Sequence, residues 1–330
     1  MKRGPSISDV AKRAGVSIAT VSRIVNGIAK KASPETVARV RAAIAETGYR
    51  PTGAGQALRT GHSRLVAVLA ANLANPTMAA IAASAESALR DAGLAMILCD
   101  THDRPDLQDE YLLEMRAQAV RACVLLGAVA SDGLRAALVD GLTLVFVNRR
   151  CPVPGTAPFV GIDNFAAGRA VAETLMTLVP AGRLAVVHGP LASSATADRL
   201  DGFKRALGRA GRRLGPGDIA TAPGLDHLAI GFAGAAALLR GEPPKGIFCA
   251  SDLIAYGAHR RAREAGLSVP GELRLHGFDD NPLNDWIAPW LSSVRVPYRG
   301  FGAAIVETLG AIWRDDVPKD RLLPFDMIAR

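Results

Sequence analysis

The stretch Ser6-Ile-Ser-Asp-Val-Ala-Lys-Arg-Ala-Gly-Val-Ser-Ile-Ala-Thr-Val-Ser-Arg-Ile-Val-Asn26 contains two short helical patterns separated by a glycine. Ser6, followed three residues later by Asp9, is typical of a helix N-cap with an acidic first turn. Gly15 ends this first helix, and Ser17 supplies the N-cap of a second one. Two capped helices joined by a glycine turn predict a helix-turn-helix.

The second of these helices has an apolar stripe and an opposite face of small, hydroxyl and basic side chains. We expect Val21, Ile24 and Val25 to face inward, because they recur at helical spacing. The opposite face suits the major groove of DNA, where Arg23 can donate two hydrogen bonds to guanine. The alternative is an ordinary helical pair in a larger bundle, with Arg23 solvated. The residues expected to contact DNA are Ser17, Ile18, Ala19, Thr20, Ser22, Arg23 and Asn26.

The charge distribution supports nucleic-acid binding by this part of the chain. Residues 1–61 contain eleven Lys and Arg against three acids, a net charge of 11 − 3 = +8, which is the net charge of the whole protein. The remaining residues therefore hold equal numbers of bases and acids. An excess confined to one small domain is typical of an electrostatic footprint for phosphates.

Length and composition limit the remaining possibilities. The chain of 330 residues has room for two or three domains. No segment approaches the ~18 apolar residues of a membrane span, and the first residues lack the apolar core of a secretory signal, so we expect a cytoplasmic protein without membrane contact. The four cysteines, which lie far apart without a Cys-x-x-Cys pair, indicate neither a zinc knuckle nor a redox motif.

A third helix and a linker complete the amino-terminal part. Ser33 and Pro34 are typical of a helix start, and Gly48 stops this helix. The glycine-rich, basic segment after it predicts a linker that orders on a partner. We therefore expect a helix-turn-helix domain over residues 1–49 and a hinge over 50–63.

Residues 64–330 alternate short apolar runs with amphipathic helices, which predicts α/β folding with parallel sheets covered by helices on both faces. The expected strands are Leu65–Ala70, Ala95–Cys99, Cys123–Leu126, Thr143–Val147, Val160–Ile162, Leu184–His188, Ile247–Ala250, Leu273–Phe278 and Ser293–Val296. This length favours two doubly wound subdomains facing across a cleft. We expect the first over about 64–162 and 292–318, and the second over about 163–291 and 319–330.

Polar side chains follow most of these strands, at the edge where ligands bind in such folds. They are Asn72, Asn75, Asp100, Asn148, Arg149, Asp163, Ser193, Ser194, Ser251, Asp252, Asp279 and Asp280. Singly, each suits a helix N-cap or a turn as well as a ligand contact. No Ser/His/Asp arrangement, metal-spaced histidine pair or carboxylate pair emerges. We therefore expect no catalytic residues, no metal and no cofactor.

Motifs along nearly the whole chain resemble those of the lactose-repressor family of bacterial transcription regulators. They are Asp9-Val-Ala-Lys-Arg-Ala-Gly-Val-Ser-Ile-Ala-Thr-Val-Ser-Arg23, Ser33-Pro-Glu-Thr36, Gly48-Tyr-Arg-Pro51, Leu58-Arg-Thr-Gly61, Asn75-Pro76, Gly189-Pro-Leu191, Arg199-Leu-Asp-Gly-Phe203, Val269-Pro270, Gly277-Phe-Asp-Asp280 and Pro289-Trp-Leu-Ser-Ser-Val294. The amino-terminal match is highly specific, and the later motifs follow the family's order.

This resemblance implies a homodimer that binds a pseudo-palindromic operator and a periplasmic-binding-protein-like core that senses a small molecule. It implies that Leu58 inserts into the minor groove and that Arg199 and Asp279 hold the effector. In the effector cleft two family residues are replaced, an acid by Asn148 and an asparagine by Ser251, and no aromatic residue is evident near 224–227. The residues expected around the effector are Asn75, Asn148, Arg149, Ser193, Arg199, Ser251 and Asp279.

The sequence thus predicts a DNA-binding regulator, expected to act as a repressor, whose effector is a sugar or a sugar acid. A purine or a phosphorylated ligand is an alternative effector. A cytosolic sugar-binding protein is an alternative function, because the core alone resembles a periplasmic carrier. An enzyme of doubly wound fold is disfavoured, since no catalytic constellation is present.

Overall fold

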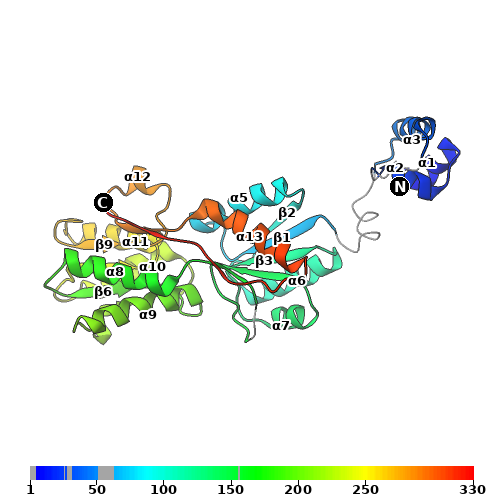
Figure 1. The fold of residues 1–330 in the computed structure, drawn as a ribbon. Coiled ribbons are helices and arrows are strands. Elements are labelled where there is room, and N and C mark those ends of the chain that lie inside the picture. Colours follow the sequence, from blue (N-terminus) through cyan, green and yellow to red (C-terminus); the bar gives the residue numbers. More distant parts are fainter. Residues whose placement is uncertain (1–4, 26, 28–31, 51–62, 155–156) are drawn as a thin grey trace. The chain divides into compact units, whose positions relative to one another are not determined.

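The computed structural model describes residues 5–25, 27, 32–50, 63–154 and 157–330, and it divides into two compact units, Met1–Arg64 and Leu65–Arg330 (Figure 1). None of the helices in these described ranges combines the length and the apolar character needed to cross a bilayer.

The amino-terminal unit consists of α1 (Ile7–Ala14), α2 (Ile18–Val25) and α3 (Pro34–Thr47). Ser6 and Asp9 form a reciprocal capping box, in which Asp9 accepts the backbone N–H of Ser6 at 2.8 Å. Gly15 ends α1 in the left-handed conformation at φ 65°, as its position predicts. Val10, Val21 and Val40, one from each helix, are fully buried and form the centre of a small core. The predicted helix-turn-helix is confirmed.

The second unit contains two parallel sheets, which we call lobe one and lobe two with the helices that cover them. The sheet of lobe one has the order β11-β5-β4-β3-β1-β2, and that of lobe two has the order β7-β6-β8-β9. The strands are β1 (Leu65–Ala70), β2 (Ala95–Asp100), β3 (Ala122–Leu126), β4 (Leu144–Val147), β5 (Phe159–Gly161), β6 (Leu184–Val187), β7 (Ile219–Ala220), β8 (Gly246–Cys249), β9 (Arg274–His276) and β11 (Arg321–Leu322).

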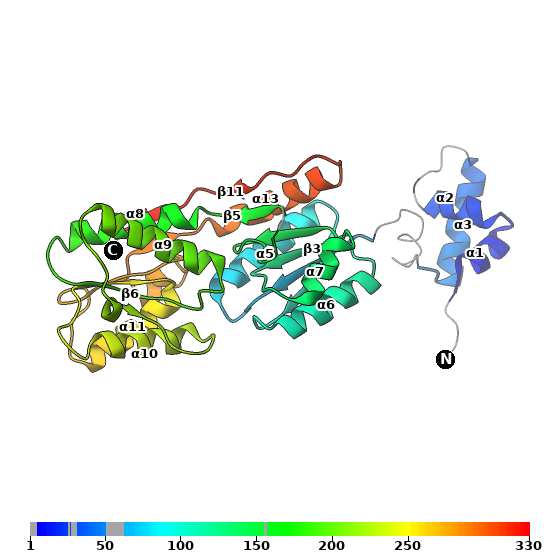
Figure 2. The same cartoon turned by 90° about the horizontal axis from the view of Figure 1, so that it is seen from below.

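Helices cover both faces of each sheet, as the alternation of strands and helices predicts (Figure 2). In lobe one α5 and α13 pack on one face and α6 and α7 on the other, while α8 and α9 face α10 and α11 across the sheet of lobe two. Their bounds are α5 (Pro76–Asp91), α6 (Pro105–Ala117), α7 (Asp132–Val139), α8 (Asn164–Leu178), α9 (Ser194–Arg209), α10 (His227–Leu238), α11 (Asp252–Glu264) and α13 (Tyr298–Ile312).

The end of the chain differs from the predicted subdomain boundaries. Arg321 and Leu322 form β11 and pair with β5 in lobe one, so the predicted assignment of 319–330 to the second subdomain is wrong for them. Farther along, β12 (Asp326–Ile328) pairs antiparallel with β10 (Ser293–Arg295), which is bridged to the end of β9 in lobe two. The chain therefore crosses between the lobes here, in strands of two or three residues that are too short to show a periodic pattern.

Three further elements are not predicted by the sequence pattern. Strand β7 has two residues, a short 3-10 helix spans Pro216–Asp218, and α12 (Asn284–Ile287) has one turn. All four cysteines are unpaired thiols, and Cys99 is half-buried on edge strand β2.

Candidate DNA-contacting surface and ligand cavity

The exposed face of α2 carries most of the residues predicted to contact DNA. Ile18 is 50% exposed, and Ala19 and Arg23 are also exposed, whereas Thr20 and Ser22 are half-buried. Asn26 and Leu58 lie outside the described residues. An exposed apolar side chain beside a guanidinium is the combination that the major groove accommodates.

Ser17 has a structural role in this unit as well as an exposed position. Its hydroxyl accepts the backbone N–H of Thr20 at 3.1 Å and lies 3.0 Å from the Thr20 hydroxyl. It therefore caps α2, as the sequence predicts. Arg13 on α1 forms a hydrogen-bonded ion pair with Glu46 on α3, with Nε 2.7 Å from Oε2. This pair links the two helices that pack against α2.

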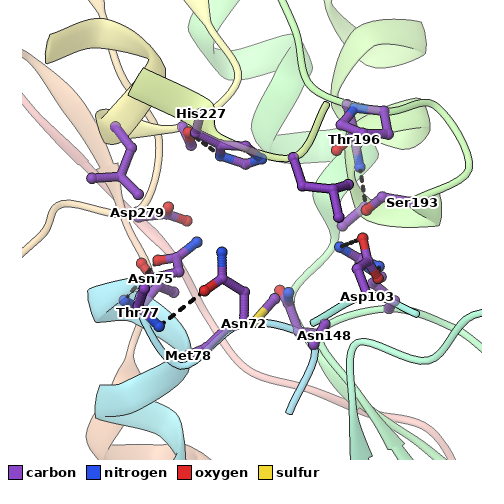
Figure 3. A pocket seen from close by; sticks show the side chains of 18 of the residues that line it. Asn72, Asn75, Thr77, Met78, Asp103, Asn148, Ser193, Thr196, His227 and Asp279 are labelled. Carbon is purple, nitrogen blue, oxygen red and sulfur yellow. Dashed lines mark hydrogen bonds and ion pairs between the residues drawn. The ribbon is translucent and has the colours of Figure 1, made fainter. Parts of the chain in front are cut away.

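A cavity of about 550 Å³ lies between the carboxyl ends of the strands of the two lobes (Figure 3). This volume is suited to a small molecule such as a mono- or disaccharide. All seven residues predicted to surround the effector line it, and they come from both lobes. Further lining residues are Ala71, Asn72, Ala74, Thr77, Met78, His102, Asp103, Pro190, Ala195, Thr196, Leu225, Asp226, His227, Leu228 and Leu253.

Four helices begin at this cavity. Asn75, Ser193, Asp226 and Ser251 are the N-caps of α5, α9, α10 and α11, and each also lines the cavity. These polar residues thus cap helices and also line the cavity. Because the amino ends of helices carry partial positive charge, their convergence favours electron-rich ligand atoms.

Arg199 on α9 lines the cavity and is held there by two hydrogen bonds and a stacking contact. Its Nε donates to Oδ1 of Asn164 and its Nη1 to the carbonyl of Ala250, both at 2.8 Å, and its guanidinium stacks 3.5 Å from the centre of the Phe278 ring. Among the described residues Nη2 has no hydrogen-bond partner, so it is available to a ligand. Burial lowers the pKa of this guanidinium.

Asp279 is the acidic counterpart of Arg199, with Oδ1 3.9 Å from its Nη1. Burial raises the pKa of Asp279, while Arg199 and a hydrogen bond from Thr77 act in the opposite direction. Its backbone N–H donates to the carbonyl of Val294 at 2.9 Å, and its carbonyl accepts the hydroxyl of Tyr298 from α13. Hydrogen bonds to Val294 and from Tyr298 thus fix the position of Asp279.

Two other acids at strand ends point away from the cavity. Asp252 accepts from the backbone of Asn281 at 2.7 Å and from the hydroxyl of Ser293 at 2.6 Å, while burial, and then the charge of Asp279, raises its pKa to about 7. Asp280 pairs with Arg295 and Arg330, each at 2.7 Å. Both carboxylates belong to the internal scaffold of lobe two.

Arg149 is less available than the sequence suggests. Its Nη1 and Nη2 lie 2.5 and 3.2 Å from the two carboxylate oxygens of Asp103, in a bidentate pair that is 13% exposed on both sides. Asp103 follows β2 in a turn and was not predicted as a site residue. Asp103 thus neutralises the charge of Arg149, which the sequence analysis expected to contact the effector.

Several lining residues have an unusual backbone conformation. His102, Asp103, Asn148 and Asp279 have φ values of 51°, 56°, 65° and 113°, in the left-handed region that residues with a side chain seldom adopt. Such conformations cluster at binding sites, where surrounding structure imposes them. Asn is tolerant of this region, which gives the uncharged Asn148 a conformational role.

His227 is a lining residue that the sequence analysis did not select. It is the first residue of α10, and its Nδ1 lies 2.8 Å from the hydroxyl of Ser251. Burial, reinforced by the charges of Arg199 and Arg149, lowers its pKa to about 4. The imidazole is therefore neutral at physiological pH. In the described part of the chain, no group of His, Cys, Asp and Glu side chains could hold a metal ion.

Comparison with known proteins identifies the family. Residues 6–52 match the model of bacterial regulatory proteins of the lacI family, and residues 181–330 match a periplasmic binding protein-like domain. The HTH-type transcriptional regulator GntR of Pseudomonas aeruginosa is 32% identical over 99% of this chain and 95% of its own. The chain belongs to the lacI family of bacterial regulatory proteins.

Solved structures of the lacI family share this architecture. A lac repressor dimer bound to operator and the anti-inducer ONPF is 25% identical, with a TM-score of 0.86 over 99% of this chain and 98% of that one. A complex of the transcriptional regulator CelR with cellobiose is 27% identical, with a TM-score of 0.71 over 99% of both chains. The helix-turn-helix unit and the two-lobed core are thus those of a lacI-family transcriptional regulator.

Proposed function

We propose that this regulator binds operator DNA through α2 and changes its operator affinity when a small polar effector occupies the cavity. Residues 1–49 act as the DNA-reading domain and 50–63 as a hinge. Two observations together carry the proposal. Residues 1–61, with a net charge of +8, present the exposed face of α2, and a separate unit contains a polar cavity. Binding, with no chemical turnover, is the function.

The effector that fits best is a sugar or a sugar acid. Its hydroxyl groups both donate and accept, and the cavity offers the matching Nη2 of Arg199 and carboxylate of Asp279. Both side chains are nearly inaccessible to solvent, at 6% and 5% exposed, so unpaired polar atoms here are costly and a ligand that pairs them is favoured. The cellobiose named with CelR supports a carbohydrate ligand.

The regulator acts as a homodimer in this proposal, as the lac repressor does in its operator complex. The apolar patch of α12 supports this, since Leu283, Trp286 and Ile287 are 50%, 84% and 60% exposed. A contiguous group of large exposed apolar side chains marks an interaction surface. A two-fold dimer would place two copies of α2 on the two half-sites of a pseudo-palindrome.

Replacing Arg23 tests DNA reading. With an operator selected from a random DNA pool, Arg23→Ala should abolish preference at one base pair in each half-site, at a cost of about 1–3 kcal/mol, because a bidentate contact is lost. Gel shifts against half-site variants measure this. Arg41→Ala is the matched control, since it removes an equal charge from exposed α3 and should weaken binding to all sequences alike. A wild-type ranking of half-sites by Arg23→Ala would contradict the proposal.

A further inference from the structure

The loop between β1 and α5 fixes the orientation of the side-chain amide of Asn72. Its Oδ1 accepts the backbone N–H of Ala74 at 2.9 Å. Only the oxygen of an amide can accept this proton, so the two ends of the side chain are distinguished and the other end is the Nδ2 donor. Asn75 is oriented in the same way, because its Oδ1 accepts the backbone N–H of Thr77 at 3.0 Å.

Asp100, at the end of β2, anchors the same loop. Its Oδ2 accepts the backbone N–H of Leu73 at 2.9 Å, and its Oδ1 accepts that of His102 at 3.0 Å. The backbone N–H of Asn75 also donates to the carbonyl of Asn72 at 3.2 Å. These bonds hold the backbone around Asn72, so its amide is placed before any ligand arrives.

The Nδ2 of Asn72 points into the ligand cavity (Figure 3). Asn72 is a half-buried lining residue, and among the described residues its Nδ2 has no hydrogen-bond partner. A ligand atom that accepts this bond is therefore favoured over one that leaves the donor unpaired. Lobe two presents the carboxylate of Asp279 to the same cavity, and an ionised carboxylate only accepts.

The turn alone does not account for an asparagine at position 72. A carboxylate would accept the backbone N–H of Ala74 as well as an amide does. This chain uses aspartate in the comparable capping positions of α8 and α10, where Asp163 and Asp226 accept backbone N–H groups. The amide differs from a carboxylate in its N–H donor and its lack of charge, and both differences act on the cavity side.

We propose that Nδ2–H of Asn72 donates a hydrogen bond to an oxygen of the effector and that Asn72 is a specificity-determining residue. This inference rests on the proposed function and gives the ligand a direction. An oxygen that accepts faces Asn72 in lobe one, and a hydroxyl that donates faces Asp279 in lobe two. A ligand without the first oxygen is rejected, since the amide is then left unpaired.

The test uses the full-length protein and calorimetric titration with D-glucose, D-galactose and D-xylose. Each sugar is compared with its monodeoxy and monodeoxyfluoro analogues at every carbon that bears a non-anomeric hydroxyl. Fluorine accepts a hydrogen bond weakly and cannot donate one. For at least one sugar there should be a carbon at which the hydroxyl compound binds at least tenfold, and the fluoro compound at least threefold, more tightly than the deoxy compound.

Variants assign this carbon to Asn72. Asn72→Ala should remove both preferences there and leave those at the other carbons. Asn72→Asp keeps an acceptor for the turn but replaces the donor, so the fluoro compound should bind no more tightly than the deoxy compound, while the hydroxyl compound, which can donate, keeps an advantage. Asp163→Asn exchanges the same two side chains at an exposed cap outside the cavity lining and is the control, with all preferences unchanged.

Thermal unfolding without ligand measures whether each variant folds, and the outcomes separate the two proposals. Unchanged preferences in the folded Asn72 variants, or no carbon at which the fluoro compound binds more tightly than the deoxy compound, would overturn the assignment of Asn72 while leaving a sugar-responsive regulator. Binding of none of these sugars, together with an operator affinity that none of them alters, would overturn both.

Discussion

A buried histidine in the core of lobe two, His276, makes the stability of the protein depend on pH. His276 on β9 is 1% exposed, with Nδ1 2.9 Å from the carbonyl of Gly277 and no partner for Nε2 within the described part of the chain. Nδ1 must therefore carry the proton and donate it, because a carbonyl only accepts. Burial lowers the pKa of His276 to about 4. Protonation of this ring therefore destabilises the folded state.

The sign of the resulting pH effect follows from proton uptake. Between pH 6.5 and about 4 the unfolded chain binds a proton at His276 that the folded chain does not, so stability is lost as pH falls. Relative to His276→Leu, the wild-type free energy of unfolding should decrease by about 1.4 kcal/mol per pH unit in this range. Urea unfolding at several pH values measures the difference.

Comparison with a variant is necessary because a buried acid acts in the opposite direction. Burial raises the pKa of Asp252 to about 7, so this carboxyl adds stability as pH falls, in wild type and variant alike. Leu275→Val, on the same strand, is the control and should change stability without changing the pH slope. Parallel slopes for wild type and His276→Leu would refute the prediction.

Among the elements, α8 and α9 pack with their backbones unusually close. A Cβ on Gly202 of α9 would lie 2.1 Å from the carbonyl oxygen of Phe165, and one on Gly168 of α8 would lie 2.1 Å from that of Arg199. Because each glycine lacks a side chain, the backbone of the other helix can pack directly against it. Gly231 and Gly257 give α10 and α11 the same reciprocal contact. These crossings set the position from which Arg199 enters the cavity.

Two glycines of α9 provide a matched pair of substitutions. Gly202→Ala should destabilise the protein by about 1–3 kcal/mol, since its methyl group overlaps a backbone oxygen that cannot move independently. Gly208→Ala, where a Cβ meets no atom within 4 Å, should instead stabilise it by about 0.5–1 kcal/mol. Chemical unfolding measures both. Equal effects of the two substitutions would show that helix propensity, not the crossing, governs them.

For the whole molecule, the proposed dimer depends on the α12 patch. Trp286→Glu combined with Leu283→Glu should yield a monomer and lose tight operator binding, because half-sites are then bound one at a time. Sedimentation at micromolar concentration gives the oligomeric state. Val139→Glu on α7, which changes a side chain that is 86% exposed, is the control and should remain dimeric. A dimer that survives the double substitution would place the interface elsewhere.

The sequence alone determined the helices of the amino-terminal unit, the parallel sheets and the set of polar residues at the strand ends. These features depend on local chemistry. A capping box spans three residues, helical and strand periods are read over one or two turns, and the amino ends of helices follow strands in any βα unit. The whole predicted effector set accordingly lines one cavity.

Only the tertiary structure decided how those polar residues divide between ligand and scaffold. Asp279 faces the cavity while Asp280 turns to Arg295 and Arg330, although the two are adjacent and chemically identical. Their φ values of 113° and 49° are held by contacts with Val294, Ser293 and Tyr298, which lie 13 or more residues away. The pairing of Arg149 with Asp103 and the crossing of β11 to lobe one arise in the same way. Each depends on partners that the fold brings together from distant parts of the chain, and no local pattern encodes that distance.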